Sequence, residues 1–189
     1  MLDQRIQGLY AITPNKKLDI ALIEGVITKH QVNILQYRNK TDNKQMRLDE
    51  AQQLRELCLT HNTLFIINDD INLCQKVGAD GVHLGQNDAS IEAARAKLGK
   101  NAVIGTSCYN QLELAVHAQK QGASYVAFGA LFQSSTKPNA GHCPLSVVTQ
   151  AKKELNLPII GIGGITFANQ QQAFDAGCDS VAMVNSLFG

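Results

Sequence analysis

The chain has 189 residues, of which 44% are hydrophobic, so we expect one domain over residues 1–189 with a single core. Seventeen Lys and Arg residues against 16 Asp and Glu residues give a net charge of +1. So small a charge argues against a general electrostatic attraction to nucleic acid or to an anionic membrane. Any anionic ligand must therefore be bound by a local cluster of basic residues.

The first five residues carry no apolar signal core, and no apolar run is long enough to span a bilayer. We therefore expect a cytoplasmic protein with no membrane partner. The five cysteines are scattered, odd in number and form no Cys-x-x-Cys pair. This usage indicates reduced thiols, with neither a zinc site nor a redox couple.

Short apolar runs alternate with longer amphipathic segments, which is the pattern of βα units around a parallel sheet. Strands are expected at residues 8–13, 32–37, 64–68, 81–84, 103–106, 125–128, 158–162 and 180–184. Helices are expected at residues 18–29, 44–61, 71–77, 91–98, 111–121, 145–155 and 167–176. Glycines at 78, 122 and 177 each precede a strand, and they predict left-handed helix ends at these positions.

Eight such units favour a closed (β/α)8 TIM barrel, an α/β fold, in compact form because about 250 residues is typical. The competing architecture is an open doubly wound sheet, which would usually have a Gly-rich phosphate turn after its first strand. Thr13-Pro14-Asn15-Lys16 offers no such turn. In a barrel the active site lies at the carboxyl ends of the strands, and the polar residues of this chain fall there.

A polar and cationic segment follows the second expected strand. Gln36, Arg38 and Lys40 are spaced by two, so their side chains point to one face while the chain stays extended. Packing explains such a face poorly, because cationic side chains are seldom buried without a partner. A solvated strand end with ordinary surface charges is the alternative.

Two carboxylates, Asp69 and Asp88, stand at the ends of the third and fourth expected strands. Hard cations such as Mg²⁺ are usually held by one or two carboxylates together with substrate phosphate oxygens. A turn or a helix cap is the alternative for Asp69, although Asp70 is the better candidate for that cap, and a helix cap is the alternative for Asp88. His83 lies within an apolar strand and is more often a satisfied core histidine than a ligand.

Further polar residues end the later strands. Ser107 ends the fifth, where a lone Ser means little by itself. A run of hydroxyls beside a lysine follows the sixth strand and suits either phosphate or a plain polar loop: Ser134, Ser135, Thr136 and Lys137. Barrels often bind phosphate with the loops after strands seven and eight. Here Gly164 precedes a helix expected to start at Thr166, and Val184-Asn185 begins another short helix.

Five motifs, in this order, resemble thiamine phosphate synthase, and the resemblance runs from about residue 9 to the end of the chain. They are Gln36-Tyr37-Arg38-Asn39-Lys40, Asn68-Asp69-Asp70, Gly81-Val82-His83-Leu84-Gly85-Gln86-Asn87-Asp88, Thr136-Lys137 and Gly161-Ile162-Gly163-Gly164-Ile165. The resemblance implies a transferase that joins 4-amino-2-methyl-5-hydroxymethylpyrimidine diphosphate to 4-methyl-5-(2-hydroxyethyl)thiazole phosphate. Pyrophosphate is released, and the thiazole nitrogen attacks the pyrimidine cation that its departure leaves. Tyr109, Ala130, Gln133 and Pro144 depart from the family pattern on the thiazole side.

The resemblance also assigns cofactor, partners and site residues. Mg²⁺ is the implied cofactor, held by Asp69 and Asp88, and the partners are the two small-molecule substrates, without nucleic acid or membrane; a homo-oligomer is left open. The residues implied in diphosphate departure are Arg38, Lys40, Ser107 and Lys137. The implied substrate-binding residues are Gln36, Tyr37, Arg38, Asn39, Lys40, Asn68, Ser107, Ser134, Ser135, Thr136, Lys137, Gly164, Val184 and Asn185. Among these, Gln36 and Asn68 would contact the pyrimidine substrate.

Two other functions stay open. One is a thiazole tautomerase, a related barrel that tends to lack the paired aspartates and the diphosphate lysine. The other is a catalytically silent barrel that binds phosphate.

Overall fold

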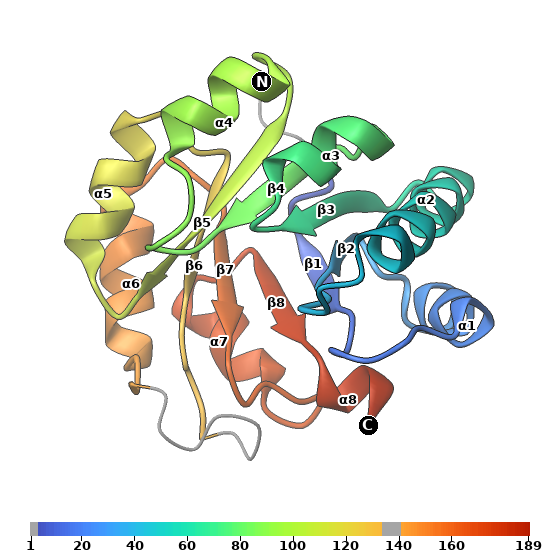
Figure 1. Cartoon of the computed structure of the whole chain (residues 1–189). Helices are drawn as coiled ribbons and strands as arrows, with labels where there is room; N and C mark the ends of the chain where they lie inside the picture. The colour runs from blue at the N-terminus through green and yellow to red at the C-terminus, as the bar shows by residue number, and fades with distance from the viewer. Residues whose placement is uncertain (1–3, 134–140) are drawn as a thin grey trace.

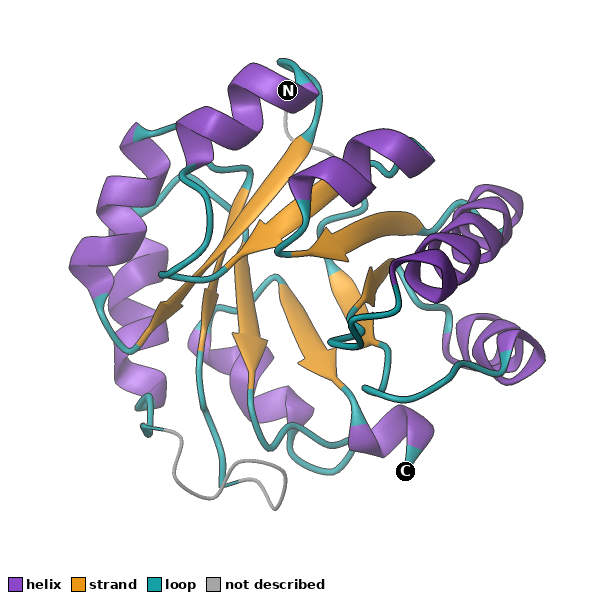
Figure 2. Ribbon diagram, viewed as in Figure 1, coloured by secondary structure: helices purple, strands orange, loops and turns teal. Residues whose placement is uncertain are grey.

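A computed structural model describes residues 4–133 and 141–189. Within these residues, eight parallel strands follow one another from β1 to β8 and close into a barrel, with eight helices in an outer layer (Figures 1 and 2). The expected (β/α)8 fold is therefore confirmed. Figure 1 shows α1 and α2 on one side of the barrel and α5 and α6 on the opposite side.

The observed elements lie close to the expected ranges. The strands are β1 (Gly8–Ile12), β2 (Ile34–Tyr37), β3 (Leu64–Asn68), β4 (Gly81–Leu84), β5 (Val103–Tyr109), β6 (Tyr125–Phe128), β7 (Ile159–Ile162) and β8 (Ser180–Met183). The helices are α1 (Ile20–His30), α2 (Lys44–Thr60), α3 (Ile71–Val77), α4 (Ile91–Leu98), α5 (Leu112–Lys120), α6 (Leu145–Glu154), α7 (Gln170–Ala176) and α8 (Asn185–Phe188). Gly78, Gly122 and Gly177 have positive φ angles, as their positions predict.

The buried side chains form two layers, because successive residues of a strand point to opposite faces of the sheet. Ile34 belongs to the cluster that fills the barrel, whereas Leu35 belongs to the larger cluster between the strands and the helices. Two tyrosines, Tyr10 and Tyr125, lie in the inner cluster. The same alternation directs each polar residue at a strand end either into the barrel mouth or toward a helix.

Every pair of neighbouring strands is parallel, so all the carboxyl ends meet at one end of the barrel. The strand β5 runs to Tyr109, three residues further than expected, with a change of register between Ser107 and Tyr109. This bulge lies at the end of the barrel that carries the polar residues. No helix in the described part of the chain is long and apolar enough to cross a membrane.

Candidate active site

The end of β2 is held by the loop that follows β1. The backbone N–H of Arg38 donates to Thr13 Oγ1 at 2.9 Å, and that of Lys40 donates to Asn15 Oδ1 at 2.7 Å. Gln36 is buried inside the barrel, Arg38 is half-buried and Lys40 is exposed. The three side chains therefore lead from the barrel interior to its mouth, as their spacing of two predicts.

Tyr37 lies on the opposite face of β2, and its position corrects the expectation that it contacts substrate. Its ring packs in the cluster between strands and helices, and its hydroxyl donates to Glu50 Oε2 of α2 at 2.7 Å. Asn39 also points to this carboxylate, with its Nδ2 3.0 Å from Oε2, while Glu50 Oε1 accepts from the Leu18 N–H at 3.0 Å. Tyr37 and Asn39 thus join the strand-end segment to α2.

We expect Tyr37→Phe to lower the free energy of unfolding by about 1 kcal/mol, because it removes one buried hydrogen bond. Turnover should stay within about twofold of wild type, a small change in barrier energy. Urea unfolding and steady-state kinetics measure the two effects. A loss of activity without a loss of stability would indicate that Tyr37 does contact the substrate.

Neither Asp69 nor Asp88 caps a helix, which was an alternative role for each residue. Asp70 caps α3 by accepting from the Leu73 N–H at 2.8 Å, and it also pairs with Arg47 at 2.8 Å. In the same way, α4 is capped by Ser90, which accepts from the Ala93 N–H. Asp69 has a φ of +62°, in the left-handed region, so the extended backbone of β3 ends at this residue.

The two carboxylates lie side by side among cationic groups. Asp88 Oδ2 accepts from the Gly85 N–H at 2.6 Å. The pKa of Asp69 is raised to about 6, chiefly by burial and then by the adjacent Asp88 carboxyl, while Lys40 and Arg38 act in the opposite direction. Asp69, just after β3, therefore interacts with three charged side chains from the segments after β2 and β4, at one edge of the barrel mouth.

This donor set could hold a hard cation. No three His, Cys, Asp or Glu side chains gather as a complete metal site within residues 4–133 and 141–189. Asp69 and Asp88 alone would supply two carboxylates, and Mg²⁺ is commonly bound in this way, with substrate phosphates and water completing its octahedral shell. The like charges of Asp69 and Asp88 also repel each other, which a bound cation would relieve.

A hydrogen-bonded row of side chains inside the barrel connects β2 to β5. Its members are Gln36, Tyr10, Tyr125, His83 and Ser107. His83 is a satisfied core histidine, as expected, and burial lowers its pKa to about 4. No sequence motif singles out Tyr10 and Tyr125, because each lies in an ordinary apolar strand. Their inward register was the only signal that could have identified them.

Asn68 ends β3 on the inner face, two residues after Ile66 of the inner cluster. Its side-chain amide has no hydrogen-bond partner among the described residues. In the sheet, Asn68 lies in register with His83 on β4. Asn68 and Gln36 thus border the same part of the barrel mouth, on adjacent strands.

The loop after β7 forms a turn instead of the helix start expected at Thr166. Asn169 closes this turn, accepting from the Thr166 N–H at 2.8 Å and donating to the Gly164 carbonyl at 2.9 Å, so α7 begins only at Gln170. A side chain at Gly164 would meet the carbonyl oxygens of Phe132 and Gln133. The loops after β6 and β7 are therefore in close backbone contact.

The loop after β8 lies beside this turn, since Ser186 Oγ donates to the Ile165 carbonyl at 3.1 Å. Val184 precedes the short helix α8, which begins at Asn185 as expected. Ser134, Ser135 and Thr136, which were also assigned to the thiazole phosphate, lie outside the described residues. Lys137, which was assigned to the diphosphate, lies outside them as well.

The five cysteines are all buried free thiols, consistent with the expected reduced state: Cys58, Cys74, Cys108, Cys143 and Cys178. Burial raises the pKa of Cys143 to about 11 and that of the other four to about 12.

We expect a variant with all five cysteines replaced by Ala or Ser, where it folds, to retain turnover. Thiol-reagent titration should label the native wild type far more slowly than the unfolded chain. A selective loss of activity on replacing Cys108 would contradict this expectation.

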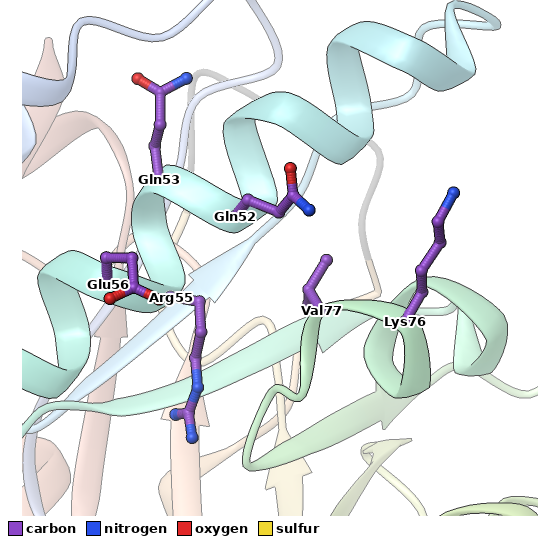
Figure 3. Close-up of a pocket in the computed structure, with 6 residues that line it drawn as sticks. All are labelled: Gln52, Gln53, Arg55, Glu56, Lys76 and Val77. Carbon is purple, nitrogen blue, oxygen red and sulfur yellow. The ribbon is translucent and has the colours of Figure 1, made fainter.

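A hollow of about 360 Å³ lies on the outer layer between α2 and α3 (Figure 3). It is lined by Gln52, Gln53, Arg55, Glu56, Lys76 and Val77. Arg55 is already paired with Asp80 at 2.9 Å, and the hollow holds no cluster of nucleophilic or metal-binding groups. The barrel mouth is therefore the better candidate for the active site.

A closed (β/α)8 barrel with paired carboxylates and cationic side chains at its strand ends is typical of barrel enzymes that act on phosphorylated substrates. The chain belongs to the thiamine monophosphate synthase family, whose model matches residues 9–187.

The similarity to known proteins covers nearly the whole chain. This chain is 46% identical to the thiamine-phosphate synthase of Chromobacterium violaceum, in an alignment that covers 97% of this chain and 89% of that protein. It is also 46% identical to the thiamine-phosphate synthase of Thioalkalivibrio sulfidiphilus, covering 98% and 89%. Among solved structures, thiamine phosphate pyrophosphorylase from Pyrococcus furiosus superposes with a TM-score of 0.87 at 28% identity, covering 96% of this chain and 88% of that one.

Proposed function

We propose that this chain joins the hydroxymethylpyrimidine diphosphate to the thiazole phosphate, forming thiamine phosphate and pyrophosphate. Family membership supports the reaction. The observation that carries the proposal is the charged cluster at the barrel mouth, where Asp69 interacts with Asp88, Arg38 and Lys40. A diphosphate ester is bound by cationic side chains that contact its oxygens and by a metal ion, which carboxylates hold.

Departure of the diphosphate is the step that these groups would assist. Breaking the bond to the pyrimidine methylene carbon concentrates negative charge on the leaving oxygen, and cations already in place lower the barrier. Arg38 and Lys40 would supply these cations. Their backbone N–H groups donate to the side chains of Thr13 and Asn15, which hold this segment in place. Asp69 and Asp88 would hold Mg²⁺, which when bound would supply further positive charge for the leaving group. Lys137 is proposed for the same role from the family resemblance alone.

The pyrimidine cation left by this step would be attacked by the thiazole nitrogen. No side chain is required as nucleophile or general base, so buried, unreactive cysteines are compatible with the scheme. Gln36 and Asn68, on adjacent strands, would orient the pyrimidine ring. The thiazole phosphate would be held by the turn at Gly164 and by Ser134, Ser135, Thr136, Val184 and Asn185.

The test is release of pyrophosphate from purified protein with both substrates. We expect release to require both substrates and a divalent cation, with thiamine phosphate formed in equal amount. A thiazole tautomerase or a silent phosphate-binding barrel would release none under the same conditions. Full activity with excess chelator would refute the cation requirement alone. The cytoplasmic location stays a prediction from the sequence.

A further inference from the structure

Four consecutive hydrogen bonds cross the barrel interior and end at Ser107. Gln36 Nε2 donates to the Tyr10 hydroxyl at 2.7 Å, and the Tyr10 and Tyr125 hydroxyls are 2.9 Å apart. The Tyr125 hydroxyl lies 3.0 Å from His83 Nδ1, and His83 Nε2 lies 2.9 Å from Ser107 Oγ. The row therefore links the strands β2, β1, β6, β4 and β5 across the barrel.

Packing holds these groups in place. Tyr10 and Tyr125 are 2% and 0% exposed, and their rings meet edge to face with centroids 6.1 Å apart. The His83 ring stacks on Tyr125 at 5.6 Å with an angle of 21° between the ring planes. Gly105 leaves the space that Tyr125 occupies, since a Cβ there would lie 1.9 Å from the tyrosine ring. The hydrogen bonds thus join rigid groups with little freedom to reorient.

The donor at the start of the row favours one direction for the others. The amide nitrogen of Gln36 can only donate, so the Tyr10 hydroxyl accepts from it. The Tyr125 oxygen is the other polar atom that contacts this hydroxyl among the described residues, so the buried Tyr10 proton is satisfied when it points to Tyr125. In this direction Tyr125 donates to Nδ1 of a neutral His83, and the imidazole proton is on Nε2. His83 Nε2–H donates to Ser107 Oγ, and the Ser107 proton is left pointing away from the row.

We propose that Tyr10, Tyr125 and His83 are positioning residues, which hold Ser107 as a hydrogen-bond donor toward the substrate diphosphate. This inference rests on the proposed function, because it needs an anion beside Ser107. In the opposite direction, Ser107 would give its proton to His83 and present lone pairs to the anion, which is repulsive. The row therefore prepares the hydroxyl for charge that grows as the diphosphate departs, and such preorganisation acts on the rate constant.

Tyr125→Phe tests the inference, because it removes the central hydroxyl and keeps the stacked ring. We expect single-turnover rates to fall by about tenfold, the effect of one hydrogen bond on the barrier, with little change in pyrimidine diphosphate affinity. In the Ser107→Ala background, the same substitution should change the rate by less than about twofold, since the group being positioned is gone. Tyr37→Phe is the matched control, because it removes a buried tyrosine hydroxyl on the outer face of β2.

A second measurement is independent of activity. Nitrogen-15 NMR of the His83 ring, assigned by loss of its signals in His83→Gln, should show the proton on Nε2 in wild type and a changed tautomer ratio in Tyr125→Phe. His83→Gln, which can place an amide N–H near the position of Nε2, should retain more activity than His83→Leu. A proton on Nδ1 in wild type, or equal effects of Tyr125→Phe with and without Ser107, would overturn the inference. Wild-type protein that releases no pyrophosphate would refute the proposed function, while the NMR result would still report the direction of the row.

Discussion

Asp69→Asn and Asp88→Asn should each lower turnover by about 10²-fold or more, a few kcal/mol of transition-state stabilisation, while the barrel stays folded. Each substitution removes one formal charge from the pair that would hold the cation. Asparagine tolerates the left-handed backbone at position 69, where φ is +62°. At position 88 the Asn side-chain oxygen can still accept from the Gly85 N–H. Circular dichroism should therefore show wild-type secondary structure in both variants.

Asp69→Asn also has an expected effect on stability that can be measured without substrate. The folded-state pKa of Asp69 is about 6, above its ordinary value of 3.8, so its ionisation opposes folding. The contribution of this group is absent at low pH and becomes unfavourable as the pH rises from about 4 through about 6. Metal-free wild type should thus lose stability relative to Asp69→Asn across this window. Thermal melts of the two proteins between pH 4 and 8 measure the difference.

Cation binding should reverse that difference. Above pH 6, Mg²⁺ should raise the melting temperature of wild type and have little effect on either variant, because a ligand stabilises only the state that binds it. Asp70→Asn is the matched control: it removes a charge one residue along but keeps an oxygen to cap α3. It should weaken the pair with Arg47 and leave turnover near wild type. Wild-type turnover in Asp69→Asn or Asp88→Asn would refute the assignment of these residues.

The local rules of strand and helix account for much of the candidate site. Alternation alone places Gln36, Arg38 and Lys40 on one face, and capping preference separates Asp70 from Asp69. The same alternation puts Tyr37 on the other face of the strand. The resemblance nevertheless placed every residue of the motif from Gln36 to Lys40 among the substrate-binding residues. Motif membership is weaker evidence of contact than strand register.

Other features depend on contacts that no local pattern contains. The hydroxyls of Tyr10 and Tyr125 meet across the barrel although the residues are 115 positions apart, and only closure of the sheet brings them together. The late start of α7 has a different, local origin. Asn169 holds the turn at Gly164 by two hydrogen bonds, which compete with the helical conformation that the periodicity of this segment predicts.

Gly164→Ala should weaken binding of the thiazole phosphate by about tenfold or more, corresponding to at least 1.4 kcal/mol. A Cβ at this position would lie 2.3 Å from the Gln133 carbonyl oxygen and 2.5 Å from that of Phe132. Backbone atoms cannot rotate away as a flexible side chain can, so the loops after β6 and β7 must separate. The backbone N–H groups proposed to bind the phosphate would move with them.

Gly78→Ala separates this clash from backbone strain. Gly78 and Gly164 share a φ of +65°, but a Cβ at Gly78 meets nothing within 4 Å, and this residue ends α3 at the opposite end of the barrel. Both variants should lose about 1–2 kcal/mol because a Cβ disfavours the left-handed conformation. Gly164→Ala should lose about 1–3 kcal/mol more from overpacking.

Urea unfolding gives the two stabilities, and titration with thiazole phosphate gives the two affinities. If the turn at Gly164 binds the thiazole phosphate, the affinity falls in Gly164→Ala and is unchanged in Gly78→Ala. Equal affinities in the two variants would mean that the loops after β6 and β7 contact each other for stability alone. The phosphate would then have to be held elsewhere at the barrel mouth.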